Sequence, residues 1–245
     1  TASIVLRTSP AAGCTALADA CAPADPEWLQ RWSSAEAAAQ KAIDDVLAGY
    51  PALTEPAVAR TLTEHLGEEV AIFVASSMPI RDVEWFGHPQ QRAKVRANRG
   101  ANGIDGLVST AVGIALSGRP TVAVLGDLAF LHDSNGLLGL RDREVDCAFV
   151  VVDNLGGGIF SFLPQASALP AERFERLFGT PQPVDIAALS EAHGIPAERV
   201  ETEGDLTSAL DNAGPRVIIV QSERGANVAV HEALNSAVAA ALVGS

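Results

Sequence analysis

Basic residues are scarce in this chain. Among 245 residues, 17 are Lys or Arg and 30 are Asp or Glu, which gives a formal net charge of -13 at pH 7. Proteins that bind nucleic acid use a basic patch or stripe to neutralise phosphates, and the sequence has no such stripe. We therefore expect no nucleic-acid partner. An acidic protein can still bind an anion, but only through local arginines, a metal ion or the N-terminus of a helix.

Cysteines and long apolar runs are also few. Cys14, Cys21 and Cys147 do not have the spacing of a metal site. The spacing of Cys14 and Cys21 allows a disulfide, but the cytoplasmic character of the remaining sequence favours free thiols. Cys147 opens an apolar strand and is predicted to be buried as a small hydrophobic residue. No apolar run reaches the roughly 18 residues of a membrane helix and no secretory signal is visible, so we expect a cytoplasmic protein with no membrane span.

The composition and patterning predict an α/β protein. Apolar residues make up 48% and charged residues 19%, enough for a large core and too apolar for a disordered chain. Short apolar strands alternate with helical patterns from residue 70 onward, which predicts a mostly parallel sheet with helices on both faces. The predicted strands are 70–75, 94–97, 121–125, 148–152 and 217–220, and the predicted helices are 26–47, 54–66, 104–116, 134–141, 185–193, 205–212 and 228–242.

Polar residues follow two successive strands at the point where each strand ends. Gly126 and Asp127 end one strand, and Asn154 ends the next and opens a glycine-rich loop. Parallel strands would place Asp127 and Asn154 side by side at the carboxyl edge of the sheet, where open α/β sheets bind ligands. Carboxylate and amide oxygens suit Mg²⁺, which completes its shell with phosphates and water. The alternative is two ordinary strand-to-helix turns, with Asp and Asn as caps and the glycines as a flexible turn.

These residues resemble the diphosphate-binding motif of thiamine-diphosphate enzymes, in which Gly-Asp-Gly is followed by two Asn. Two positions differ from that motif: Leu128 replaces the second Gly and Asp153 replaces the first Asn. Leu128 is usual in one branch of the superfamily, the 2-succinyl-5-enolpyruvyl-6-hydroxy-3-cyclohexene-1-carboxylate synthases of menaquinone biosynthesis. Three further segments are similar to that branch in sequence and order: 75–82 (ASSMPIRD), 98–106 (NRGANGIDG) and 156–164 (GGGIFSFLP).

The resemblance implies a cofactor site. Thiamine diphosphate and Mg²⁺ (or Mn²⁺) would be the cofactors, and the metal ligands would be Asp127, Asn154 and the carbonyl of Gly156. The remaining cofactor-binding residues implied by the family are Gly126, Leu128, Ala129, Ile104 and Ser77. Ile104 would hold the cofactor in a bent shape. Ser77 would bond the cofactor or an intermediate, or cap a helix, or both.

The resemblance also implies catalytic and substrate-binding residues. Arg81 and Arg99, with Ser77, are the catalytic candidates. The two arginines match residues that contact substrate carboxylates, which a guanidinium grips with two parallel hydrogen bonds. Ile159, Phe160 and Leu163 match an apolar wall beside the second substrate. The alternative for the arginines is an exposed surface position, and for these apolar residues and Ile104 it is the plain core.

The implied activity is the decarboxylation of 2-oxoglutarate and the conjugate addition of the succinyl-semialdehyde unit to isochorismate. The implied enzyme is a homo-oligomer (dimer or tetramer) with the active site at the subunit interface. We expect this chain to be part of a longer polypeptide: 1–50 as the end of a central domain and a helical linker, and 51–245 as the diphosphate-binding domain. The pyrimidine-binding domain, with the glutamate that activates the cofactor, would lie before Thr1, so the isolated chain is expected to be inactive. The alternatives are another thiamine-diphosphate 2-oxo-acid decarboxylase or carboligase, and a non-catalytic cofactor-binding module.

Overall fold

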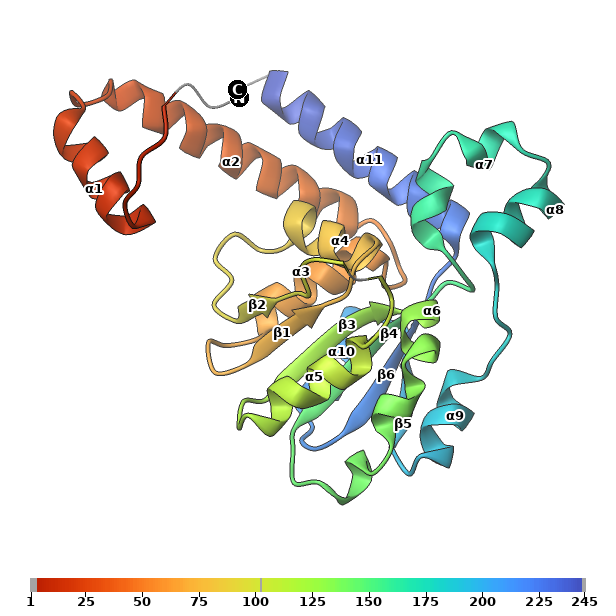
Figure 1. Ribbon diagram of the computed structural model, residues 1–245. Helices are drawn as coiled ribbons and strands as arrows, with labels where there is room; N and C mark the ends of the chain where they lie inside the picture. The colour runs from red at the N-terminus through yellow and green to blue at the C-terminus, as the bar shows by residue number, and fades with distance from the viewer. Residues whose placement is uncertain (1–3, 102, 244–245) are drawn as a thin grey trace.

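A computed structural model describes residues 4–101 and 103–243. It is built on a six-stranded sheet in the order β2-β1-β3-β4-β6-β5, and every neighbouring pair of strands is parallel (Figure 1). The predicted α/β class is confirmed. The strands are β1 (Ala71–Val74), β2 (Lys94–Arg96), β3 (Thr121–Gly126), β4 (Cys147–Asp153), β5 (Ala197–Val200) and β6 (Arg216–Gln221).

Helices cover both faces of the sheet. On one face α5, α6 and α9 pack on a core that includes Phe73, Phe149 and Ile219. On the other face α3, α4 and α10 pack on a core that includes Ile72, Val150 and Ile218. Because the central strands are buried on both faces, their sequences are nearly continuous apolar runs. The longer α-helices are α1 (Pro10–Ala20), α2 (Pro26–Leu47), α3 (Glu55–His65), α4 (Met78–Phe86), α5 (Leu107–Leu116), α6 (Asp127–His132), α9 (Ile186–Ala192), α10 (Glu203–Leu210) and α11 (Arg224–Val243).

The sequence predictions differ from the structure at several segments. The helix predicted at 134–141 is wrong: α6 begins directly at Asp127, and two 3-10 turns, η1 (Ser134–Leu137) and η2 (Leu140–Asp142), follow it. Strand β5 was not predicted because only Val200 of its four residues is buried. The segment after β4 was not predicted either, and it contains η3 (Gly158–Phe162), α7 (Gln165–Ala168), α8 (Ala171–Phe174) and the π-turn η4 (Glu175–Gly179).

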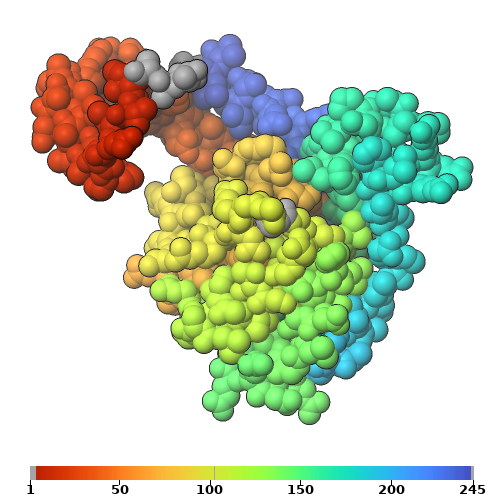
Figure 2. Space-filling model, viewed as in Figure 1, coloured from red at the N-terminus to blue at the C-terminus, as the bar shows by residue number. Residues whose placement is uncertain are grey.

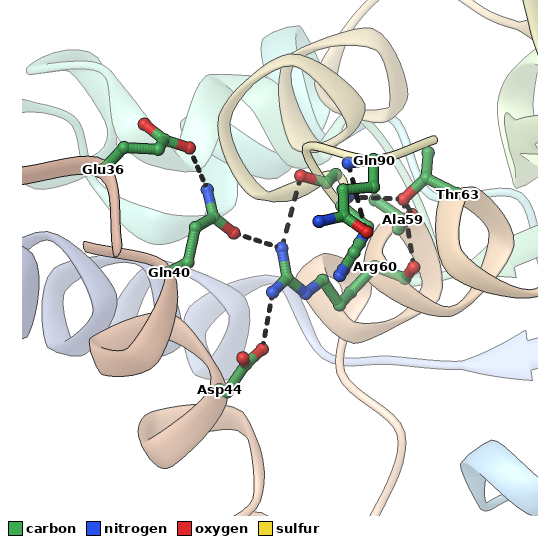
Figure 3. Close-up of polar contacts among 9 residues, drawn as sticks. Glu36, Gln40, Asp44, Ala59, Arg60, Thr63 and Gln90 are labelled. Atoms are coloured by element: carbon green, nitrogen blue, oxygen red, sulfur yellow. Dashed lines mark hydrogen bonds and ion pairs between the residues drawn. The ribbon is translucent and has the colours of Figure 1, made fainter. Parts of the chain in front are cut away.

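The predicted helix over 26–47 is confirmed, and its second half packs beside α11 at one end of the molecule (Figure 1). Arg60 of α3 joins α2 to the domain. Its guanidinium donates to Gln40 Oε1, to Asp44 Oδ1 at 2.7 Å and to the Gly87 carbonyl, and Gln40 in turn donates to Glu36 (Figure 3). The first half of α2 and α1 project away from the α/β body (Figure 2).

Helix α11 is long and apolar enough to cross a membrane by length and composition, and 22% of its most apolar window is buried. Polar residues nevertheless interrupt it, since His231, Glu232 and Asn235 fall within its length. His231 is buried against α4, where its Nε2 lies 3.0 Å from Asp82 Oδ1. The helix therefore contains no uninterrupted apolar run of membrane-spanning length.

The three cysteines are unpaired. Cys14 and Cys21 are exposed and form no disulfide, whereas Cys147 is fully buried at the start of β4. Burial raises the pKa of the Cys147 thiol to about 12. The prediction that Cys147 behaves as a small buried hydrophobic residue is therefore confirmed.

Candidate functional site

The candidate site lies at the carboxyl edge of the sheet. After β1 the chain passes onto one face through α4, and after β3 it passes onto the other face through α6. Such a reversal between neighbouring strands is a topological switch point, where open α/β sheets bind their ligands. The motif residues around Ser77, Asp127 and Asn154 all follow strands at this edge, as expected from the sequence.

Asp127 is buried directly after β3, with 2% of its surface exposed. Its Oδ2 accepts a hydrogen bond of 2.7 Å from the N–H of Gly156, so the two halves of the motif are in contact. Its Oδ1 is also buried and has no hydrogen-bond partner among the described residues. A buried carboxylate oxygen without a donor is costly, so this position fits a cation or a hydrogen-bond donor.

Asn154 presents a second unpaired oxygen one strand away. The register pairs Gly126 of β3 with Val152 of β4, so Asp127 and Asn154 follow neighbouring strand ends. Asn154 is 8% exposed, its Nδ2 donates to Glu55 at 3.0 Å, and its Oδ1 is buried without a partner in the described structure.

The glycine-rich loop has a shape that other residues would not allow. Gly156 has a φ of 140°, and a Cβ at this position would collide with the carbonyl oxygen of Gly179. That same carbonyl accepts a hydrogen bond of 2.8 Å from the N–H of Gly157. The loop is therefore an ordered close approach of two backbones, and the alternative of a merely flexible turn does not describe it.

The electrostatics of Asp127 fit a cation. Burial raises the pKa of the Asp127 carboxyl to about 6, and the charge of Asp153 adds to the rise. Backbone N–H groups of Leu128 and Gly156 and the charge of Arg224 act in the opposite direction. The described residues contain no group of three or more His, Cys, Asp or Glu side chains that could hold a metal. A cation here would therefore rely on amide and backbone oxygens as well as on Asp127, a set that suits Mg²⁺.

Ser77 and Arg81 lie together at the end of β1. Ser77 has a φ of 76°, rare for a residue with a side chain, and such strain concentrates at functional sites. It stands at the N-cap position of α4, but its side chain makes no capping hydrogen bond. Arg81, which is half-buried, donates from Nη1 to the Ser77 carbonyl at 2.6 Å. The hydroxyl of Ser77 is thus not used as a cap, which leaves the ligand-binding alternative.

Arg99 and Ile104 lie in the loop after β2. Arg99 is exposed and makes no hydrogen bond or ion pair with the described residues. Ser76 Oγ donates to the Gly103 carbonyl at 3.0 Å, which ties this loop to the end of β1. Ile104 is 38% exposed and therefore does not belong to the core. Asn102 of the same motif lies outside the described residues.

The apolar candidates after Asn154 also lie outside the core. Ile159 and Phe160 are half-buried in η3, and Leu163 is 41% exposed. The alternative of a plain core position therefore fails for all three. By contrast Ala129, in α6, is buried in the core under one sheet face, and Leu128 is half-buried beside Asp127.

Sequence reasoning missed several buried polar residues near the motif. Glu55 accepts hydrogen bonds from the Asn154 amide and from Ser222, and Asp82 and His231 form a buried pair that acts electrostatically on Glu55. Arg224 lowers the pKa of Asp127 and pairs with Glu175 at 2.7 Å. These residues come from segments far apart in the chain, so no local spacing marks them. The only sequence signal was Glu55 itself, an acidic residue directly after a predicted N-cap.

The comparisons with known proteins agree with this site. Residues 88–221 match the family described as "Thiamine pyrophosphate enzyme, C-terminal TPP binding domain". The chain is 45% identical over 223 residues to a 2-succinyl-5-enolpyruvyl-6-hydroxy-3-cyclohexene-1-carboxylate synthase of Synechococcus elongatus, a match that covers 89% of this chain and 38% of that protein. A synthase of the same name from Chloroflexus aurantiacus is 43% identical over 90% of this chain and 39% of its own length.

A solved structure supports the fold. Benzoylformate decarboxylase from Polynucleobacter necessarius is similar with a TM-score of 0.55 and 26% identity, over 69% of this chain and 33% of that one. The chain spans about two-fifths of the length of the curated relatives it matches. The resemblance predicted from four short motifs is confirmed by these relatives. The chain thus belongs to the thiamine pyrophosphate (thiamine diphosphate) enzyme family, whose C-terminal cofactor-binding domain it matches over residues 88–221.

Proposed function

We propose that the protein to which this chain belongs decarboxylates 2-oxoglutarate and adds the resulting succinyl-semialdehyde unit to isochorismate, in menaquinone biosynthesis. The observation that carries the proposal is the pair of buried, unpaired oxygens on Asp127 and Asn154, at the carboxyl edge of a family-typical sheet. The names of the curated relatives state the product of such a synthase, and the two substrates are those that the family resemblance implies. The corresponding enzyme class is a transferase that forms a carbon–carbon bond between the two substrates, that is, a carboligase.

The chain's residues fit a bound metal and diphosphate. Asp127 and Asn154 would hold Mg²⁺, or Mn²⁺, through side-chain oxygens, and Gly156 through its carbonyl. The backbone of 126–129 would lie beside the diphosphate, and the exposed side chain of Ile104 would support the ring system. When bound, thiamine diphosphate supplies the electron sink that the decarboxylation of a 2-oxo acid requires.

Two arginines would orient the anionic substrates. Arg81 uses one nitrogen on the Ser77 carbonyl, and Arg99 is exposed at the same edge of the sheet. Both substrates are dicarboxylates, so bidentate contacts from these residues would hold them in reacting geometry. Ser77 would contribute a hydroxyl, and the uncovered Ile159, Phe160 and Leu163 would exclude water beside the second substrate.

The proposal includes a larger cytoplasmic assembly. Residues 1–50 would end a central domain and link it to 51–245, in agreement with the projection of α1 and the first half of α2 from the α/β body. Trp28 and Trp32 are 52% and 63% exposed there, and apolar surface of this kind is usually covered by a partner surface. A homo-oligomer, dimer or tetramer, would complete the active site, so the isolated chain would be inactive.

The test is carbon dioxide release by the full-length protein with Mg²⁺ and thiamine diphosphate. We expect turnover of 2-oxoglutarate and formation of the adduct only when isochorismate is present. Turnover of pyruvate or benzoylformate instead would support the cofactor assignment and contradict the substrate assignment. Benzoylformate is included because the chain is similar to a benzoylformate decarboxylase. No turnover of any 2-oxo acid by the folded protein would favour a non-catalytic cofactor-binding module.

A further inference from the structure

A buried carboxyl group lies behind the Asn154 amide. Glu55 is the first residue of α3, after the Thr54 cap, and is 4% exposed. Its Oε1 accepts two hydrogen bonds, one from Asn154 Nδ2 at 3.0 Å and one from Ser222 Oγ at 2.9 Å. Burial raises the pKa of the Glu55 carboxyl to about 7. None of the proposed cofactor contacts involves the Glu55 carboxyl, although burying a carboxyl group costs free energy.

The contact with Glu55 fixes which end of the Asn154 amide faces the site. An asparagine side chain carries a donor NH2 at one end and an acceptor oxygen at the other, and the Glu55 oxygen that it meets also accepts from Ser222, so this oxygen takes the acceptor role. Because the NH2 of Asn154 is held by Glu55, its Oδ1 is directed away from Glu55, and this is the buried oxygen that lacks a partner. A rotated amide would place the NH2 there instead, and an NH2 group cannot bind a cation.

The surroundings of Glu55 hold it in this place. Ser222 follows β6, and its N–H donates to the Asp153 carbonyl at 3.0 Å, directly before Asn154. The two donors to Glu55 Oε1 therefore come from the ends of the neighbouring strands β4 and β6. Because Glu55 Oε1 already accepts two hydrogen bonds from this chain, its link to the candidate site is the contact with the Asn154 amide.

We propose that Glu55 is a positioning residue for the cation site: it holds the Asn154 amide with its oxygen directed to the position beside Asp127. The proposal rests on the proposed function, because it presumes that Asp127 and Asn154 bind a metal ion. Outer-shell groups that orient metal ligands typically contribute 10- to 100-fold to metal affinity. A merely structural contact between α3 and the sheet would affect folding and leave metal affinity unchanged.

The experiment is a Mn²⁺ titration of the full-length protein in the presence of thiamine diphosphate, with free Mn²⁺ followed by electron paramagnetic resonance. Glu55→Met removes the acceptor at similar length and is expected to weaken Mn²⁺ binding at least tenfold. Glu55→Gln retains an acceptor oxygen and is expected to stay within about threefold of the wild type. Circular dichroism and unfolding of the metal-free proteins check that each variant folds, and Glu55→Ala serves if the methionine variant does not.

Ser222→Ala is the matched control. It removes the other donor to the same Glu55 oxygen without touching the Asn154 amide, so Mn²⁺ affinity should stay within about threefold of the wild type. Unchanged affinity in Glu55→Met would overturn the proposal. A loss of Mn²⁺ affinity in Glu55→Gln equal to that in Glu55→Met would show a role of charge and not of orientation. An equal loss in Ser222→Ala would show general loosening of the sheet edge. Either result also overturns the proposal.

A second comparison separates this proposal from the function on which it rests. Asp127→Ala removes a proposed ligand and should abolish Mn²⁺ binding. If Asp127→Ala binds Mn²⁺ normally, the cation site and the proposed function are both wrong. If Asp127→Ala loses the metal and Glu55→Met keeps it, only the positioning role of Glu55 is wrong.

Discussion

The two edges of the sheet treat buried polar groups in opposite ways. At the amino edge, Arg216 opens β6 and is 6% exposed. Its guanidinium donates to the carbonyls of Ala209, Leu210 and Gly214 and to Asp146 Oδ1, all between 2.7 and 3.1 Å. At the carboxyl edge, Asp127 and Asn154 each leave an oxygen buried and unpaired in the described structure.

This difference between the two edges distinguishes a structural polar residue from candidate ligand-binding residues. Arg216 is a donor surrounded by acceptors, so the chain satisfies it without help and its role is to close the end of the sheet. Asp127 and Asn154 follow neighbouring strand ends and each keeps an acceptor oxygen without a donor in the described structure, which is the arrangement that the proposed cation site requires. Burial of polar groups is thus common to both edges, and the balance of donors and acceptors tells the two roles apart.

Asp127→Ala should have the largest effect. We expect activity of the full-length enzyme to fall about a thousandfold, because a metal contributes several kcal/mol by holding charge in place. The unfolding midpoint of the metal-free protein should stay the same or rise, since a buried carboxyl with a raised pKa is removed. Steady-state kinetics and thermal unfolding measure the two effects. A large loss of stability would mean that Asp127 resembles Arg216 and is structural.

Arg216→Met should have the opposite signature. Three carbonyls and Asp146 lose their donor, so we expect a loss of about 3 kcal/mol in the free energy of unfolding. Mn²⁺ affinity of the protein that remains folded should be unchanged, because Arg216 lies at the other edge of the sheet. Denaturant unfolding and the metal titration check this. Weakened metal binding with intact stability would contradict the division between the edges.

The pH dependence of stability should report Glu55. Its pKa is about 7 in the folded protein against a usual value of 4.5, so the folded state holds the proton more tightly. The stability that this proton contributes is present below pH 4.5 and is lost as the pH rises through 7, by about 3 kcal/mol. Glu55→Gln should remove this loss. Unfolding of the metal-free wild type and variant from pH 4.5 to 8 measures it, and parallel curves would refute the assignment.

Arg99→Lys should have the smallest effect. Arg99 is exposed and makes no hydrogen bond or ion pair with the described residues, so the change should alter stability by no more than about 0.5 kcal/mol. A lysine cannot form two parallel hydrogen bonds to a carboxylate, so the catalytic efficiency with a dicarboxylate substrate should fall about tenfold or more. Arg216→Lys is the matched control and should lower stability instead. Normal turnover by Arg99→Lys would reject its role in substrate binding.

Much of the fold follows from local pattern. Helix α2 begins at Pro26 after the Asp25 cap, and α3 begins at Glu55 after the Thr54 cap with Pro56 as its second residue, all of them residues typical of helix starts. Strands β3 and β4 were predicted because both faces are buried and their sequences are continuously apolar. Strand β5 is an exposed edge strand, with only one buried residue, and therefore lacks such a pattern.

The candidate site was predicted only in part for a similar reason. Asp127 and Asn154 stand at recognisable strand ends, so parallel pairing alone brings them together. Glu55 and Ser222 are separated from Asn154 by 99 residues on one side and 68 on the other, and only the tertiary structure joins them. A residue that orients another leaves no motif of its own, because its effect depends on a partner that the local sequence does not contain.

The contact between Gly157 and Gly179 closes the segment between them into a loop with fixed ends. The interior of that loop carries Ile159, Phe160 and Leu163, whereas the proposed metal ligands Asp127, Asn154 and Gly156 lie before it. Changes in the length or sequence of the interior therefore leave the frame of the sheet intact. If the proposed roles hold, the segment between Gly157 and Gly179 is a replaceable cassette: its exchange would alter the choice of substrate while the cofactor anchor stays in place.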